Sequence, residues 1–182
     1  PAPTRSRTTG YTHQASPRAV AAATVPTIRR ARILRIMDSL PRVPLCLLPT
    51  PLHRLDRASE ALGIDLWMKR DDLTGFAMGG NKGRKLEYLL ADAVASGATT
   101  VVTCGAAQSN FVRQLGAACA VAGLKLSVAA MALPYEEAPP PGARPATGGN
   151  VTLGKIFGID MRVGPDGTWD ELFARADALA DD

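Results

Sequence analysis

The sequence predicts an α/β domain in which a mainly parallel sheet is covered by helices on both faces, giving three layers. The first indication is that short apolar runs alternate with amphipathic helical patterns from residue 64 onward. The second is that a glycine follows several of the helical patterns, at the position where a helix C-terminus favours it. Since strands separated by a helix usually pair in parallel, this order of elements indicates the fold class.

The domain begins with a proline-rich stretch. Four prolines between residues 40 and 51 enforce extended or turn conformations. Residues 54–62 have a helical pattern that ends at Gly63, and residues 64–68 alternate as in a strand. The charged segment KRDD (residues 69–72) comes next, and we expect it to form an ion-paired turn that shapes the following loop.

The centre of the chain has the clearest patterns. Apolar residues recur at helical spacing over residues 82–94 and stop at a glycine. Residues 99–104 form a β-branched run that is typical of a buried strand. A second helix is predicted after Ser109, which can cap it, and it ends at Gly123. Residues 124–131 are the next predicted strand.

The last part of the chain continues the alternation. Residues 133–150 are rich in proline and glycine, and we expect them to form a flexible connection. A helix is predicted near residues 150–157, a strand at residues 159–163, and a final helix that starts near Thr168.

Positive charge is concentrated at the N-terminus. Residues 1–37 contain seven arginines and no acid, although the whole chain has a formal charge of only +4. This composition has little to bury, so we expect a disordered basic tail at residues 1–37 and a folded domain at residues 38–182. An arginine-rich, acid-free segment is also typical of a transit peptide. Because the folded part is weakly acidic, no nucleic-acid partner is expected.

The apolar runs and the cysteines indicate the cellular location of the protein. No apolar run approaches the roughly 18–20 residues that cross a bilayer, so we expect no membrane partner. The three cysteines lack the spacing of metal ligands. We therefore expect a reduced, cytoplasmic protein without a bound metal.

The segment GGNKGRKLEYL (residues 79–89) carries the first candidate for chemistry. Its glycine pair lets backbone and ligand come close to Lys82, which falls on the first turn of a predicted helix. The positive end of the helix dipole and the nearby cation Lys85 both favour the neutral amine. That form condenses with a carbonyl. The alternative is that Lys82 is an ordinary solvated lysine.

The segment CGAAQSN (residues 104–110) carries the second candidate. It follows a predicted strand, at the carboxyl end where α/β sheets collect ligands. Backbone N–H groups and the hydroxyl of Ser109 make a receptor for a carboxylate or phosphate. The alternative is that Ser109 only caps the helix. The adjacent amide of Asn110 favours a binding role, because a capping serine does not need it.

Four motifs resemble one known enzyme family in order and spacing. They are PTPL (residues 49–52), KRDDLT (69–74), GGNKGRKLEYL (79–89) and QSNFVRQ (108–114). Together they resemble the family of D-cysteine desulfhydrase and 1-aminocyclopropane-1-carboxylate deaminase, pyridoxal-phosphate enzymes of the tryptophan-synthase β-subunit-like fold (fold type II). The resemblance implies that the chain is the N-terminal portion of such an enzyme, and that the phosphate loop lies in an absent C-terminal half.

The resemblance also implies roles for five residues. Lys82 corresponds to the lysine that holds pyridoxal phosphate as an internal Schiff base and exchanges a substrate proton. Asn110 corresponds to the residue that hydrogen-bonds the 3-oxygen of the cofactor, and Lys85 to a lysine near its phosphate. Ser109 corresponds to the receptor of the substrate carboxylate, which also takes part in the deaminase chemistry. Phe111 stands near the substrate, where desulfhydrases have His and deaminases have Gln.

The implied function is that of a lyase or deaminase of small amino acids, which forms a homodimer at full length. The residues around Lys82 and Asn110 favour the desulfhydrase branch, which converts D-cysteine to pyruvate, sulfide and ammonia. The 1-aminocyclopropane-1-carboxylate deaminase branch is the alternative. A further alternative, of another class, is a truncated, non-catalytic α/β fragment. Gly83 replaces a Thr or Leu of the family, and we expect this to have little effect.

Overall fold

The structure is a computed structural model that describes residues 39–131 and 148–181. From Leu40 onward the chain belongs to one structural unit. The predicted basic tail at residues 1–37 and most of the predicted connection at residues 133–150 lie outside the described residues, so both stay predictions. In the described part, no helix is long and apolar enough to cross a membrane.

The central sheet has three parallel strands. They are β3 (Thr100–Ala106), β4 (Lys125–Met131) and β5 (Asp160–Gly164), in the spatial order β3-β4-β5. All three lie within one or two residues of the strands that the sequence predicts. The central strand β4 is apolar and buried nearly throughout, whereas β3 is mostly half-buried and β5 is mostly exposed.

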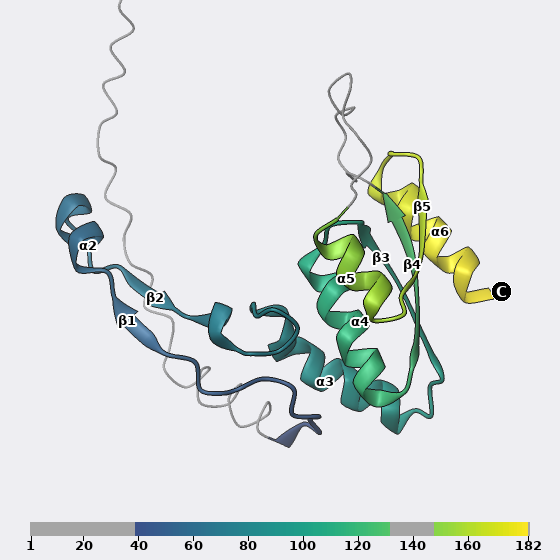
Figure 1. Ribbon diagram of the computed structural model, residues 1–182, viewed down its shortest axis with the longest axis horizontal. Helices are drawn as coiled ribbons and strands as arrows, with labels where there is room; N and C mark the ends of the chain where they lie inside the picture. Colours follow the sequence, from purple (N-terminus) through teal and green to yellow (C-terminus); the bar gives the residue numbers. More distant parts are fainter. Residues whose placement is uncertain (1–38, 132–147, 182) are drawn as a thin grey trace, which may run out of the picture. The chain divides into compact units, whose positions relative to one another are not determined.

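Helices cover both faces of this sheet, as predicted (Figure 1). Helices α4 (Asn110–Ala122) and α5 (Asn150–Ile156) lie on one face, and α6 (Trp169–Asp181) lies on the other. Helix α3 (Lys82–Ala95) packs against α4. The chain therefore has the predicted three-layer α/β fold.

Strand β4 contributes to the core on both faces of the sheet. Val128 and Ala130 pack in the cluster beneath α4, whereas Ala129 and Met131 pack with Leu172 of α6. Successive side chains of a strand point to opposite faces, so one fully apolar strand can serve two cores. The predicted strand at residues 124–131 is apolar nearly throughout for this reason.

Local hydrogen bonds explain where two helices begin. The hydroxyl oxygen of Ser109 accepts the backbone N–H groups of Phe111 and Val112, at 3.2 and 3.4 Å, at the start of α4. At the start of α6, Thr168 N donates to Glu171 Oε2 at 2.9 Å and Glu171 N donates to Thr168 Oγ1 at 3.3 Å. The second arrangement is a capping box, which fixes the first residue of α6.

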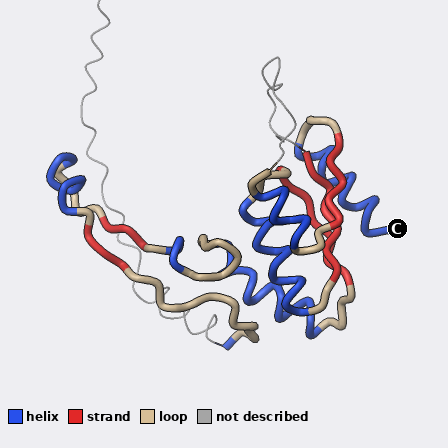
Figure 2. Tube along the Cα trace, in the orientation of Figure 1, coloured by secondary structure: helices blue, strands red, loops and turns tan. Residues whose placement is uncertain are grey.

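A second, two-stranded sheet differs from the prediction (Figure 2). Strand β1 (Leu52–Arg54) pairs antiparallel with β2 (Trp67–Lys69), and helix α2 spans Asp56–Leu62. The predicted strand at residues 64–68 was therefore placed too early, and β1 was missed. All three residues of β2 are exposed, so no alternation of burial shaped the sequence there.

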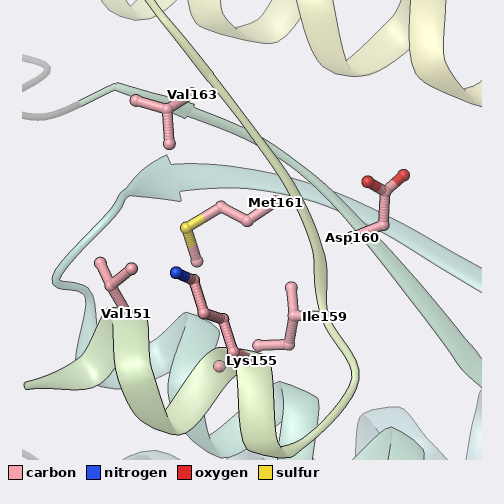
Figure 3. A pocket seen from close by; sticks show the side chains of 7 residues that line it. Val151, Lys155, Ile159, Asp160, Met161 and Val163 are labelled. Carbon is pink, nitrogen blue, oxygen red and sulfur yellow. The ribbon is translucent and has the colours of Figure 1, made fainter. Parts of the chain in front are cut away.

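A groove of about 360 Å³ lies between α5 and β5 (Figure 3). The side chains of Val151, Lys155, Ile159 and Met161 surround it, so its lining is mostly apolar. Asp160 points away from these side chains and forms an ion pair with Arg162 at 3.2 Å. None of the predicted site residues lines this groove.

Candidate active site

The loop before α3 is built around the carboxylate of Asp71. This carboxylate accepts hydrogen bonds from Arg84 Nε at 2.8 Å, Arg84 Nη2 at 2.6 Å and Thr50 Oγ1 at 2.7 Å. The hydrogen bond from Arg84, with that from Thr50, lowers the pKa of Asp71 to about 2. The backbone oxygen of Asp71 accepts from Gly80 N at 2.7 Å. The prediction that this charged segment is an ion-paired turn shaping the loop is confirmed.

The two glycines of this loop are required by its geometry. Gly79 has a φ of +74°, and a Cβ there would lie 2.1 Å from the backbone oxygen of Asp72. Gly80 has a φ of +118°, and its Cβ would lie 2.8 Å from Gln114 Nε2. The glycine pair therefore lets the protein's own atoms, Asp72 O and Gln114 Nε2, come close to the backbone here.

Two side chains of α4 hold this loop from the other side. Arg113 Nη2 donates to the carbonyl oxygen of Gly79 at 3.0 Å, and Gln114 Nε2 donates to the same oxygen at 2.9 Å. Gln114 is fully buried and Arg113 is 9% exposed. Burial lowers the pKa of the Arg113 guanidinium. These bonds join the two segments that the sequence marks as separate candidates.

Ser109 and Asn110 form the turn that leads into α4. The oxygen of Ser109 accepts two backbone N–H groups, so its interpretation as a helix cap is confirmed. Its hydroxyl proton can still be donated to a ligand, and its binding role stays a prediction. Asn110 is exposed, and its Oδ1 accepts from Arg113 Nη1 at 2.8 Å and from Asn150 Nδ2 at 3.1 Å.

The structure places the predicted lysines at the start of α3. Lys82 is the first residue of the helix and is half-buried. The side chain of Asn81, the residue before the helix, accepts no hydrogen bond from the backbone N–H groups of its first turn. Lys85 is exposed, and its Nζ lies 4.1 Å from the centroid of the Phe111 ring. This cation–π contact brings two predicted site residues together.

A cleft of about 620 Å³ connects the two loops. Its charged and polar lining comes from Lys69, Asp71, Asp72, Asn81, Asn110 and Arg113, together with Met78 and the glycine pair. Of the five predicted site residues, Asn110 lines the cleft, whereas Lys82, Lys85, Ser109 and Phe111 do not. Within the described residues, no cluster of His, Cys, Asp or Glu could hold a metal ion.

Sequence reasoning missed three polar residues that organise the site. Arg113 and Gln114 are buried polar side chains in a helix that is otherwise mostly apolar, and this contrast was the available signal. Asn150 follows a glycine pair at the start of a predicted helix, as Asn81 does. Its hydrogen bonds to the turn before α4 join residues about forty positions apart, which no local pattern shows.

Position 83 is more constrained than expected. Gly83 is buried in the first turn of α3, and a Cβ there would lie 2.4 Å from Cys46 Sγ and 3.3 Å from Gln114 Oε1. A Thr or Leu at this position would therefore need space that Cys46 now fills. The expectation that the exchange has little effect does not hold for the packing.

The three-layer fold, in which helices cover both faces of a parallel sheet, is that of fold type II pyridoxal-phosphate enzymes. Residues 43–182 match the family described as pyridoxal-phosphate dependent enzyme, and the chain belongs to this family. Within it, the chain is homologous to 1-aminocyclopropane-1-carboxylate deaminases and D-cysteine desulfhydrases.

Individual relatives show how far this similarity extends. The 1-aminocyclopropane-1-carboxylate deaminase of Methylobacterium sp. (strain 4-46) is 41% identical over 148 residues, which cover 75% of this chain and 42% of that protein. The D-cysteine desulfhydrase of Salmonella newport (strain SL254) is 53% identical over 91 residues, which cover 50% of this chain and 28% of that protein. A crystal structure of an ACC deaminase homologue matches with a TM-score of 0.70 at 38% identity, covering 82% of this chain and 42% of that one.

The chain thus spans less than half the length of the deaminases that it matches. The family match over residues 43–182 includes the three-stranded sheet and the two joined loops.

Proposed function

We propose that the protein is a pyridoxal-phosphate-dependent lyase or deaminase of small amino acids, with Lys82 holding the cofactor. The observation that carries this proposal is the joining of the two candidate loops. Arg113 and Gln114, which follow the turn of Ser109 and Asn110 in α4, donate to the carbonyl of Gly79, three residues before Lys82. This link between the two segments supports a site to which both contribute a polar group.

The residues present fit the cofactor. Both hydrogen bonds to Asn110 Oδ1 leave the Nδ2 group of an exposed amide as a donor for a ring oxygen. Lys82 and Lys85, one turn apart at the start of α3, supply amines for an aldehyde and an anionic group. When bound, pyridoxal phosphate supplies an electron sink that stabilises negative charge on the α-carbon of an amino acid.

Each side chain then has a defined task. The ε-amine of Lys82 holds the cofactor and, once released, takes a proton from the substrate carbon and returns it. The hydroxyl of Ser109 donates its proton to a substrate carboxylate oxygen, because its own oxygen is engaged by Phe111 N and Val112 N. Lys85, held over the ring of Phe111, provides positive charge at the same helix start.

We propose D-cysteine as the first substrate to test, with release of pyruvate, sulfide and ammonia. The 53% identity to a D-cysteine desulfhydrase supports this choice. Deamination of 1-aminocyclopropane-1-carboxylate to an α-keto acid and ammonia is the second candidate, supported by the greater share of the chain that deaminases match. Assays of sulfide and of keto acid on both substrates separate the two. We also propose a homodimer for the complete protein, which light scattering tests.

Cofactor loading is the first experiment. The complete protein should develop visible absorbance when pyridoxal phosphate is added, and Lys82→Ala should lose it entirely. Lys155→Ala, at a lysine of the groove between α5 and β5, is the matched control and should keep the absorbance. Equal absorbance in Lys82→Ala would remove Lys82 from the mechanism. Absence of absorbance in the wild type would favour a non-catalytic α/β protein.

A further inference from the structure

Arg113 is the residue on which three separate segments of the chain converge. Its guanidinium donates to Asn110 Oδ1 at 2.8 Å, to Asn150 Oδ1 at 2.7 Å and to the carbonyl oxygen of Gly79 at 3.0 Å. The side chain is 9% exposed, so it is almost removed from solvent. A buried guanidinium with three acceptors from different segments is strongly held, because each bond is charge-assisted.

The guanidinium determines which way two amides face. Arginine only donates hydrogen bonds, so the atoms of Asn110 and Asn150 that contact it must be their oxygens. The nitrogen of Asn150 then turns the other way, where it donates to Gln108 O at 2.6 Å and to Asn110 Oδ1 at 3.1 Å. The Oδ1 of Asn110 therefore receives two donors, one from Arg113 and one from Asn150.

An amide oxygen has two lone pairs, and both of those on Asn110 are used. A flipped amide would set its N–H groups against two donors, which is unfavourable in a partly buried network. Asn110 is also exposed and lines the cleft. The amide therefore presents its Nδ2 group, a pure donor, to whatever acceptor the cleft holds.

The same guanidinium connects the Asn110 amide to the loop before α3, which leads to Lys82. Arg113 Nη2 shares the carbonyl of Gly79 with Gln114 Nε2, and Gly79 lies three residues before Lys82. One side chain thus fixes the direction of the Asn110 amide and the position of the turn that leads to Lys82.

We propose that Arg113, supported by Asn150, is the positioning residue that keeps the Asn110 amide turned with its N–H groups toward the cofactor's ring oxygen. This inference rests on the proposed function, since the acceptor is the bound pyridoxal phosphate. Arg113 acts through Asn110, because its Nη1 and Nη2 groups are already engaged by Asn110, Asn150 and the carbonyl of Gly79. A donor to the ring oxygen stabilises its ionised form and so lowers the pH at which the bound cofactor changes its absorbance.

The test is a pH titration of the visible absorbance of the loaded, complete protein. In Arg113→Met the Asn110 amide is free to flip, so the midpoint should rise by about one pH unit, the effect of losing one hydrogen bond to a charged group. Arg54→Met is the matched control, because it removes a guanidinium from β1 that pairs with Asp56 and Asp65, and its midpoint should equal that of the wild type.

A double-mutant cycle separates positioning from general loosening of the structure. If Arg113 acts through Asn110, then Arg113→Met should add no further shift when Asn110 is already Ala. A shift of the same size in the Asn110→Ala background would overturn the inference, as would a wild-type midpoint in Arg113→Met alone.

A second variant keeps the test valid if Arg113→Met does not fold. Asn150→Ala leaves the guanidinium in place and removes one of the two donors to Asn110 Oδ1. It should shift the midpoint in the same direction by less, and an unchanged midpoint in this variant would overturn the inference. Absence of cofactor absorbance in the wild type would instead contradict the proposed function, so the two failures are distinguishable.

Discussion

The two helix starts that form the candidate site are stabilised in opposite ways. Helix α4 is capped by the residue just before it, since Ser109 accepts N–H groups of its first turn. Helix α3 has no side-chain cap from Asn81, and the loop before it is held by distant residues instead. Thr50, which donates to Asp71 of the loop, and Arg113, which donates to the carbonyl of Gly79, hold that loop from two other segments.

This difference indicates which half of the site depends on the complete fold. A self-capped turn keeps its conformation through local hydrogen bonds. A turn held by long-range contacts loses its shape when any one contact is removed, and it can also be adjusted by them. Lys82, the proposed nucleophile, directly follows the turn that is held by long-range contacts.

The largest effect is expected at the glycine turn before α3. In Gly79→Ala the new Cβ would lie 2.1 Å from the oxygen of Asp72 at a φ of +74°, so the free energy of unfolding should fall by about 3 kcal/mol or more. Gly97→Ala is the control, because Gly97 has a φ of +73° with no atom within 4 Å, and it should cost about 1 kcal/mol. Urea unfolding measures both. Equal losses would mean that the turn is not as tightly enclosed as the structure shows.

The next effect is expected from the carboxylate that supports the same loop. Asp71→Asn removes the charge that Arg84 and Thr50 hydrogen-bond, and it should cost about 1.5 kcal/mol, since solvent at the partly exposed Arg84 screens part of the interaction. Asp72→Asn, which breaks only the exposed pair with Arg70, should cost less. The comparison would fail if the two variants unfolded at the same urea concentration.

The titration of the Asp71 carboxylate should make the free energy of unfolding depend on pH. The pKa of Asp71 is lowered from 3.8 to about 2 by Arg84 and Thr50, so the unfolded chain binds this proton first as the pH falls. Its contribution is complete above about pH 3.8 and is lost as the pH falls toward 2. Acid titrations of unfolding should show this loss in the wild type, and Asp71→Asn should lack it.

A smaller effect is expected at the self-capped helix start. Ser109→Ala removes the acceptor for two N–H groups and should lower the free energy of unfolding by about 1 kcal/mol. Ser109→Asp keeps a capping oxygen and should restore most of this stability. If Ser109→Asp were as unstable as Ser109→Ala, the hydroxyl would have a role other than capping.

The smallest effect is expected at the contact between the two helix starts. The Nζ of Lys85 lies 4.1 Å from the Phe111 ring centroid on an exposed side chain, so Phe111→Leu should remove about 0.5 kcal/mol of coupling. A double-mutant cycle with Lys85→Met isolates this coupling from other losses. A coupling of zero would show that the ring positions the ammonium without stabilising it.

The same contrast explains what the sequence could predict. Strand β4 and helices α3 and α4 follow from burial, which imprints an apolar pattern on the chain. The cap at Ser109 was predictable because both partners lie within three residues. Strand β2 was misplaced because its residues are exposed and pair with β1 through the backbone, without a side-chain pattern.

The contacts that hold the loop before α3 could not be predicted from the sequence, for a physical reason. Arg113 contacts Gly79 and Asn150 across more than thirty residues in each direction, and only the folded chain brings them together. The candidates Lys82, Ser109 and Asn110 were recognisable because they belong to short motifs. Their mutual positions depend on Arg113, which lies in the motif QSNFVRQ, but the motif does not show its distant partners Gly79 and Asn150.

The side chain of Cys46 occupies the space that a side chain at position 83 would need. Since a β-carbon on residue 83 would come within 2.4 Å of the sulfur, enlarging one position demands shrinkage of the other. Bulkier residues beside the proposed nucleophile should thus be accessible only through reciprocal exchange with the proline-rich segment. An engineer who wishes to reshape this end of α3 should vary both positions in one library.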